Sequence, residues 1–275
     1  MIALLRNPSG LVGVLLVAVV VAAALTSLLW TPHDPLIVDP AAGWLAPSAS
    51  HLLGTDALGR DSFSALLVGA QVTLGSALLA TAVAAALGLP LAAIIELTPP
   101  MLSAFLQRFV DIMIAFPTLI LAVILVTSFG SSTWTAAVAV GLGASVVVAR
   151  TVAPELRRAR SSDYALLATA AGASSGRIML HHVLPNAGST IVVRLTQILA
   201  GSALAEAGLS YLGFGTPTPT PSWGRTLAEM QPQIMTRPEV LLAPALCIVI
   251  VVLGFNLLGD GLRDILDPRT RRSTP

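Results

Sequence analysis

The chain has 275 residues, of which 55% are hydrophobic and only 11% are charged, and its mean hydropathy is +0.84. Soluble domains carry charges on about one quarter of their residues, so this composition excludes an ordinary soluble fold. Long apolar runs predict an all-α integral membrane protein, because a backbone in lipid must satisfy its own hydrogen bonds. The formal charge of +1 gives no indication of a nucleic-acid partner, and we expect none.

Six apolar segments reach the length of about 20 residues that a membrane-spanning helix needs. The first ends at Trp30 and is longer than the apolar core of a cleaved signal peptide, so we expect a retained span. Pro90 in the second segment can kink its helix or mark its approach to the membrane interface, and Pro117, which follows Phe116 in the third, leaves the depth of that segment open. We predict one transmembrane domain over residues 1–275, with spans at 11–30, 66–95, 109–129, 134–153, 190–209 and 240–258.

The distribution of arginine, which supplies all 15 basic residues, predicts the orientation of the chain. An even number of spans puts both termini on one side. With the termini in the cytoplasm, 12 arginines are cytoplasmic and only Arg60, Arg225 and Arg237 lie outside, as the positive-inside rule favours. The resulting topology has outer segments at 31–65 and 210–239 and a cytoplasmic loop at 154–186.

The cytoplasmic loop carries four arginines, too many for a span, and its pattern predicts two short helices. Asp163 is a suitable N-cap for a helix at 164–171, which Gly172 can end in a left-handed conformation. Ser174 can cap a second helix of about two turns, which Pro185 stops. The first helix has a small apolar face, formed by Ala165, Leu166, Ala168 and Ala170, which suits a groove on a partner protein. The helix pair equally suits an amphipathic position on the membrane surface.

Five blocks of residues in order along the chain resemble the permease subunits of ATP-binding-cassette (ABC) importers. They are most similar to the C-type subunit of the dipeptide, oligopeptide and nickel (Dpp/Opp-like) class. The blocks are His51-Leu52-Leu53-Gly54-Thr55-Asp56 with Leu58-Gly59-Arg60-Asp61; Arg108, Asp111 and Ala115-Phe116-Pro117; Gly172-Ala173-Ser174, Arg177-Ile178 and His182-Val183-Leu184-Pro185-Asn186; Glu206, Leu209-Ser210, Leu212-Gly213 and Pro221-Ser222-Trp223-Gly224; and residues 255–264 with Leu266-Asp267-Pro268-Arg269.

The resemblance implies a type I ABC importer permease fold with six transmembrane helices and a cytoplasmic coupling-helix loop, in a bacterial cytoplasmic (inner) membrane. It implies that the chain binds no cofactor, and that partner ATPase subunits, separate or fused, bind ATP and Mg²⁺. A sister permease would complete a heterodimer, and a solute-binding protein would dock on the outer face. The implied cargo is a di- or oligopeptide, with nickel as the alternative. The residues expected to contact the ATPase are Ala168, Ala170, Gly172, Ala173, Ser174, Arg177, His182, Leu184, Pro185 and Asn186.

The cytoplasmic loop departs from the family pattern at one point. The family usually carries a Glu-Ala-Ala triplet six residues before the glycine, whereas this chain has Leu166-Leu167-Ala168. The helix is preserved, because leucine and alanine are good helix formers, but an acidic contact to an ATPase is not expected here.

Three polar residues inside predicted spans are candidates for the translocation path: Gln197, Glu206 and Asn256. A carboxylate in a span is expensive and is usually functional, so Glu206 is the principal candidate. It can instead pair with Arg225 or form a structural hydrogen bond to a neighbouring helix, as the amides can.

The sequence lacks the residues that most enzymatic and metal sites need. With no lysine, the phosphate-binding loop of an ATPase is excluded, and we predict no catalytic and no metal-binding residues. His181 and His182 point about 100° apart on a helix and do not share a face. In the outer segment, His33 or His51 would be the contact if nickel were the cargo. An ion-coupled secondary transporter and a membrane-embedded enzyme remain alternative classes, and intramembrane charges would mark the former.

Overall fold

The computed structural model describes residues 7–266, which form helices and connecting loops with one isolated β-bridge between Thr55 and Asp61. Five helices are long and apolar enough to cross a membrane. They are α2 (Pro8–Leu29), α3 (Ser62–Leu97), α6 (Thr133–Arg160), α9 (Leu184–Tyr211) and α11 (Glu239–Leu266). The shorter helices are α4 (Pro100–Ala115), α5 (Thr118–Phe129), α7 (Asp163–Ala170), α8 (Ser175–Ile178) and α10 (Trp223–Met230).

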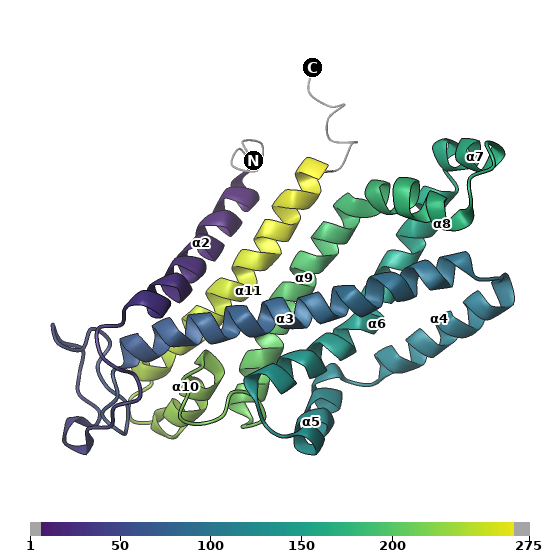
Figure 1. Ribbon diagram of the computed structural model, residues 1–275. Coiled ribbons are helices and arrows are strands. Elements are labelled where there is room, and N and C mark those ends of the chain that lie inside the picture. Colours follow the sequence, from purple (N-terminus) through teal and green to yellow (C-terminus); the bar gives the residue numbers. More distant parts are fainter. Residues whose placement is uncertain (1–6, 267–275) are drawn as a thin grey trace.

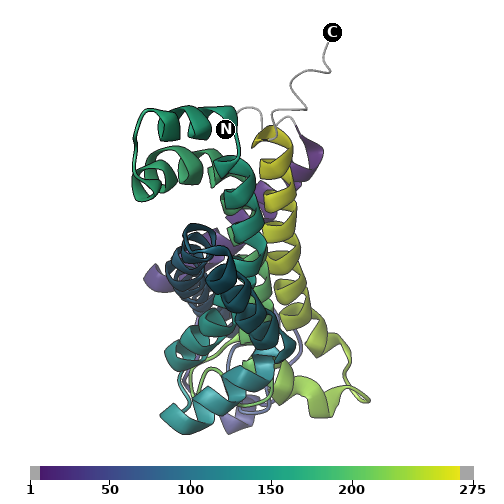
Figure 2. The ribbon, with the colours of Figure 1, turned by 90° about the vertical axis from the view of Figure 1, so that its right-hand side faces the viewer.

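The long helices form one bundle whose two ends differ in character (Figure 1). Helix α11 packs between α2 and α9, and the 36-residue α3 runs obliquely across the bundle and packs along α6. The start of α2, the end of α11 and the α7–α8 element lie at one end, while α5, α10 and the segment between α2 and α3 lie at the other (Figures 1 and 2). This division matches the two sides that the arginine distribution predicts.

Small residues bring α3 and α6 into close contact. A Cβ atom added at Gly88 of α3 would lie 2.5 Å from the carbonyl oxygen of Ser145, and one added at Gly141 of α6 would lie 2.6 Å from the carbonyl oxygen of Ala80. Ala84 between these contacts is fully buried. In lipid there is no hydrophobic force between helices, so such close packing holds them together by dispersion.

The third predicted span is wrong in its start, and two helices form it. Instead of one helix over 109–129, the chain forms α4 and α5, which are bent by 80° at Phe116 and Pro117. Proline has no N–H to continue the helix and pushes the preceding residue out of the helical region, and Phe116 is accordingly extended (φ −80°, ψ 124°). The bent pair counts as a sixth crossing only if both helices lie within the membrane.

The expected stop at Pro185 is also wrong. A π-helical segment, Met179–Val183, follows α8 and runs directly into α9, so residues 175–211 form one continuous helical element. In this wider turn the Leu184 N–H donates to the Met179 carbonyl five residues back. Pro185 follows this wider turn directly, and the helix continues past it although proline has no N–H to donate.

The α3–α6 contact leads to a test with a matched pair of variants in one helix. Gly88→Ala should lower the stability of the protein in detergent by about 1–3 kcal/mol, because the new methyl group meets backbone and no flexible side chain. A thermal unfolding midpoint measures the effect. Gly75→Ala is the control, since its Cβ would lie 3.6 Å from Trp134 in ordinary contact. Equal midpoints for the two variants would contradict the packing described.

Candidate functional site

Helix α7 ends in a tight, well-defined turn. Gly172 has a φ of +82°. Its N–H donates to the Thr169 carbonyl at 3.0 Å, and the Ala173 N–H donates to the Ala168 carbonyl at 3.1 Å. This pair of bonds is the Schellman arrangement, which glycine favours because it pays no steric penalty at positive φ. The turn therefore forms as the sequence predicts, although Ser162, and not Asp163, is the N-cap residue of α7.

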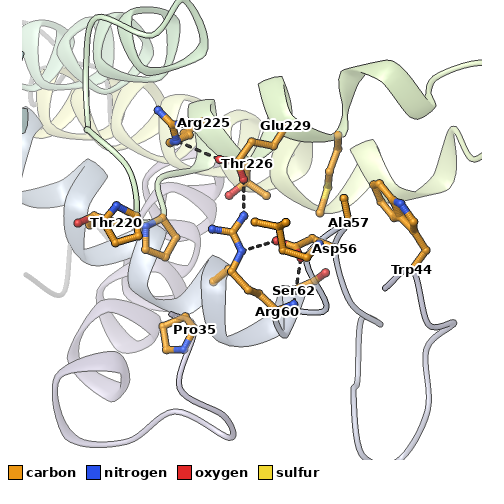
Figure 3. A pocket seen from close by; sticks show the side chains of 15 residues that line it. Pro35, Trp44, Asp56, Ala57, Arg60, Ser62, Thr220, Arg225, Thr226 and Glu229 are labelled. Carbon is orange, nitrogen blue, oxygen red and sulfur yellow. Dashed lines mark hydrogen bonds and ion pairs between the residues drawn. The ribbon is translucent and has the colours of Figure 1, made fainter. Parts of the chain in front are cut away.

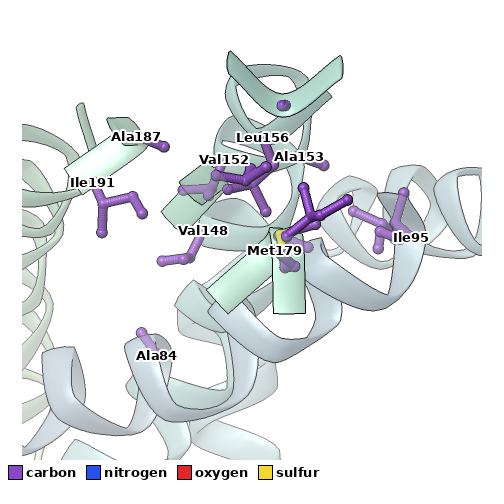
Figure 4. Close-up of a cluster of buried hydrophobic side chains, with 14 of the residues drawn as sticks. Ala84, Ile95, Val148, Val152, Ala153, Leu156, Met179, Ala187 and Ile191 are labelled. Atoms are coloured by element: carbon purple, nitrogen blue, oxygen red, sulfur yellow. The ribbon is translucent and has the colours of Figure 1, made fainter. Parts of the chain in front are cut away.

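The α7–α8 element is held against the bundle by a buried apolar cluster (Figure 4). Ala165 of α7 and Met179 after α8 are 1% and 2% exposed, and they pack with Val152 and Leu156 of α6 and with Ile95 of α3. The element therefore moves with the ends of α3, α6 and α9. The expectation that Ala165 belongs to an outward docking face is wrong, because this side chain lies in the core.

Two larger apolar residues of α7 are exposed. Leu166 and Leu167 are 56% and 71% exposed, and Leu166 stands where the family triplet has its acidic residue. Most of the predicted coupling residues are exposed, and the others are half-buried. The exposed ones are Ala170, Gly172, Ser174, Arg177, Pro185 and Asn186, and the half-buried ones are Ala168, Ala173, His182 and Leu184.

Ion pairs brace the base of this element. Glu96 near the end of α3 accepts a hydrogen bond from Arg157 Nε at 3.1 Å, and its carbonyl oxygen accepts one from Arg160 at 2.6 Å. Arg150 of α6 pairs with Asp111 of α4 at 2.9 Å. These contacts border a polar cleft of about 780 Å³ at the α3–α4 corner.

At the opposite end, an arginine joins the two predicted outer segments (Figure 3). Arg60 donates to Asp56 and to Glu229 of α10, both at 2.6 Å, and Glu229 also accepts from Arg225 at 3.0 Å. Burial alone would lower the pKa of Arg60, but the two carboxylates outweigh this effect and raise it. The residues around this network enclose a cavity of about 260 Å³.

The expected pairing of Glu206 with Arg225 does not occur, because Glu206 lies in a buried polar cluster between helices. The side chain is 3% exposed and accepts hydrogen bonds from Thr73 of α3 at 3.0 Å and from Ser210 at 2.7 Å. The Thr216 hydroxyl lies at 3.4 Å. In this conformation the carboxylate connects α3, α9 and the loop after α9.

The other two path candidates make local contacts. Gln197 accepts a hydrogen bond from Arg194 at 3.1 Å, and the Asn256 side chain donates to the Val252 carbonyl at 2.9 Å. Both residues are half-buried. Gln197 lies on α9 and Asn256 on α11, whereas Thr73 lies on α3. The structure does not bring them into the Glu206 cluster, and their role in a translocation path stays a prediction.

Sequence reasoning named His33 and His51 as separate nickel contacts but did not predict that they meet with Asp61 in the outer segment. His51 lies 2.9 Å from Asp61 through its Nδ1 atom, and the rings of His33 and His51 are stacked with centroids 4.6 Å apart. Burial alone would raise the pKa of Asp61, but hydrogen bonds from Ser64 and His51 lower it overall. The fold of the outer segment brings His33, His51 and Asp61 together. They are far apart in sequence, so no spacing motif in the sequence indicates this group.

The fold and the projecting α7–α8 element define a class of transport permease. Residues 84–272 match the family described as "Binding-protein-dependent transport system inner membrane component", and the chain belongs to this family. It is thus a multi-pass inner-membrane component of an ABC importer, a class that works with ATPase subunits and a solute-binding protein. The predicted membership and fold class are confirmed.

Relatives with assigned names support this placement. The chain is 33% identical over 266 residues to the "Dipeptide transport system permease protein DppC" of Alkalihalophilus pseudofirmus, covering 97% of this chain and 88% of that relative. It is 38% identical over 225 residues to the "Glutathione transport system permease protein GsiD" of Escherichia coli O6:K15:H31, covering 82% and 74%. A "Putative peptide permease protein" of Brucella suis is 34% identical and covers 96% of this chain and 88% of its own length.

Solved structures share the fold at lower identity. An inward-facing structure of the MetNI methionine ABC transporter matches with a TM-score of 0.60 and 21% identity, covering 74% of this chain and 96% of that chain. An amino acid ABC transporter solved with histidines matches with a TM-score of 0.53 and 18% identity, covering 76% and 92%. These likenesses bear on the fold alone.

Two variants of Glu206 distinguish a structural role of this side chain from a role in transport. Glu206→Leu removes the acceptors of buried hydroxyl groups and should destabilise the protein by about 1–3 kcal/mol. Glu206→Gln keeps an acceptor and should leave the thermal unfolding midpoint nearly unchanged. If the charge acts in the translocation path, uptake falls in Glu206→Gln while the amount of assembled complex does not. Normal uptake by that variant would leave Glu206 a structural residue.

Proposed function

We propose that the chain is one of two permease subunits in an ATP-driven importer of di- or oligopeptides. The observation that carries the proposal is the 33% identity to a dipeptide permease over 97% of this chain. A peptide permease from Brucella suis and a glutathione permease, glutathione being itself a short peptide, lie at similar identity. Nickel, the alternative cargo, has no counterpart among these relatives.

The proposed docking surface for the ATPase is the outward face of the α7–α8 element. It is exposed, it projects beyond the bundle (Figure 2), and it is apolar at Leu166 and Leu167. Because α8 continues through the π-helical segment into α9, a push on this element is carried into a long helix without an intervening loop. ATP and Mg²⁺ would be held by the ATPase subunits, and this chain would supply mechanical coupling and no catalytic residue.

The proposed orientation places this docking surface and both termini in the cytoplasm. Five arginines lie on the last turns of α6 and in the α7–α8 element or close to them: Arg150, Arg157, Arg158, Arg160 and Arg177. Arg60, Arg225 and Arg237 lie at the opposite end, where a solute-binding protein would dock. The positive-inside rule supports this arrangement. A sister permease would complete a heterodimer around the pathway, with lipid covering the outward apolar faces.

Cargo is tested by uptake in a strain that lacks the gene and carries it back on a plasmid. Radiolabelled di- and oligopeptides should accumulate in the complemented strain and not in the deletion strain. Labelled nickel should accumulate equally in both. Nickel uptake that depends on the gene, with peptide uptake that does not, would replace the peptide assignment with the alternative cargo.

The coupling role is tested at the turn after α7. Gly172→Ala should weaken co-purification of the ATPase about fivefold or more, because an alanine at positive φ costs roughly 1–2 kcal/mol. Gly176→Ala is a matched control, since neither position has an atom within 4 Å of an added Cβ and only Gly172 has a positive φ. Full retention of the ATPase by Gly172→Ala, or equal loss in both variants, would count against this turn as the determinant of docking.

A further inference from the structure

Three side chains that can bind metal meet at the end of the bundle opposite α7. One ligand atom from each of His33, His51 and Asp61 lies within 4.8 Å of the other two. The three residues come from different parts of the outer segment: His33 follows α2, His51 lies in the middle of the loop, and Asp61 caps α3. A ligand held by all three would therefore tie the loop to two transmembrane helices.

The hydrogen bonds of the two imidazoles leave nitrogen lone pairs available. His33 Nε2 lies 2.7 Å from the Ser50 carbonyl oxygen, which can only accept, so this nitrogen is the donor. His51 Nδ1 lies 2.9 Å from Asp61 Oδ1, which likewise only accepts when ionised. These bonds do not use His33 Nδ1 or His51 Nε2, and an imidazole binds a metal through a nitrogen that carries no proton.

The spacing of His51 and Asp61 suits a cation in place of the proton between them. Their 2.9 Å separation is near the roughly 3.3 Å between two ligands that are each 2.0–2.1 Å from a tetrahedral cation. On binding, the proton that His51 donates from Nδ1 moves through solvent to Nε2, so the number of protons is unchanged. Asp61 keeps its other oxygen, Oδ2, bonded to the Ser64 N–H and hydroxyl.

His33 supplies the third ligand by a change of side-chain angle. Its ring is stacked on His51 with 29° between the planes, so the in-plane lone pairs do not yet converge. His33 is exposed, whereas His51 is half-buried and Asp61 is buried, so His33 is the side chain that turns, and in turning it exchanges its hydrogen bond to the Ser50 carbonyl oxygen for the cation. His51 and Asp61 hold their positions, and His33 turns toward them to complete the site around the cation.

The surroundings favour a doubly charged cation. The same three residues line a cavity of about 250 Å³ together with Asp34 and Asp39. Each of these two aspartates has one oxygen bonded to a backbone N–H, of Leu36 or Ala41, which leaves the other oxygen toward solvent or a bound water. Imidazole and carboxylate ligands in a mixed set are typical of zinc and of its neighbours in the first transition row.

We infer that His33, His51 and Asp61 form a binding site for a divalent transition-metal cation of the zinc type, which fastens the outer segment 31–61 to the start of α3. The site is separate from the proposed coupling surface and does not depend on the identity of the transported cargo. It gives the outer segment a second attachment besides the pair of Arg60 with Glu229.

The test uses the purified importer complex in detergent after treatment with a chelator. Titration with ZnCl₂ in a calorimeter should show one high-affinity site per copy of this chain, and CoCl₂ should give a visible absorption band of tetrahedral cobalt. His33→Ala should weaken binding of zinc at least tenfold and remove the band. Because His33 is exposed, this variant should assemble normally, and His51→Gln provides a second ligand variant.

His181→Ala is the matched control, since His181 is an exposed histidine at the other end of the bundle whose ring lies 3.2 Å from the Arg177 carbonyl oxygen. It should bind zinc as the unaltered complex does. Zinc should also slow amide hydrogen exchange in residues 31–61, and His33→Ala should abolish that effect. The inference is overturned if the unaltered complex binds no zinc, or if His33→Ala and His181→Ala bind it equally.

Discussion

Helices α3 and α6 touch through their backbones at Gly88 and Gly141, where even a methyl group has no room. The rest of the bundle is arranged around this contact. It sets the oblique course of α3 and places the end of α3 beside the end of α6, so that Glu96 can reach Arg157 and Arg160. The α7–α8 element then rests on the same pair of helices. Two small residues thus determine where the proposed docking surface stands relative to the transmembrane helices.

Motion can pass from that surface into the bundle because no flexible connection lies between them. Met179 and Val183 of the π-helical segment are buried in the cluster that also holds Ile95 and Leu156. The π-helical segment keeps the helix continuous past Pro185. A force applied at Leu166 and Leu167 therefore acts on α3, α6 and α9 together, which is the condition for rigid-body rocking of a permease.

The opposite end is built from polar contacts, in contrast to the apolar middle. Arg60, Glu229 and Arg225 join the two outer segments, and Trp223 donates from its ring nitrogen to the Leu66 carbonyl at 2.8 Å. Glu206 and its partners Thr73, Ser210 and Thr216 join α3, α9 and the loop after α9. This layer holds the long loops in place, and the bent pair of α4 and α5 reaches the same end. A structured outer face of this kind can present a defined surface to a binding protein.

The sequence by itself determined the class of the protein, most of its helices and the turn at Gly172, and its arginines predict an orientation. These features depend on local properties: apolar length, helix propensity, positive φ and charge. Only the tertiary structure decided that Ala165 faces inward, that Glu206 meets Thr73, and that His33, His51 and Asp61 converge. Each of these depends on contacts between residues distant in sequence, whose distances no local pattern encodes.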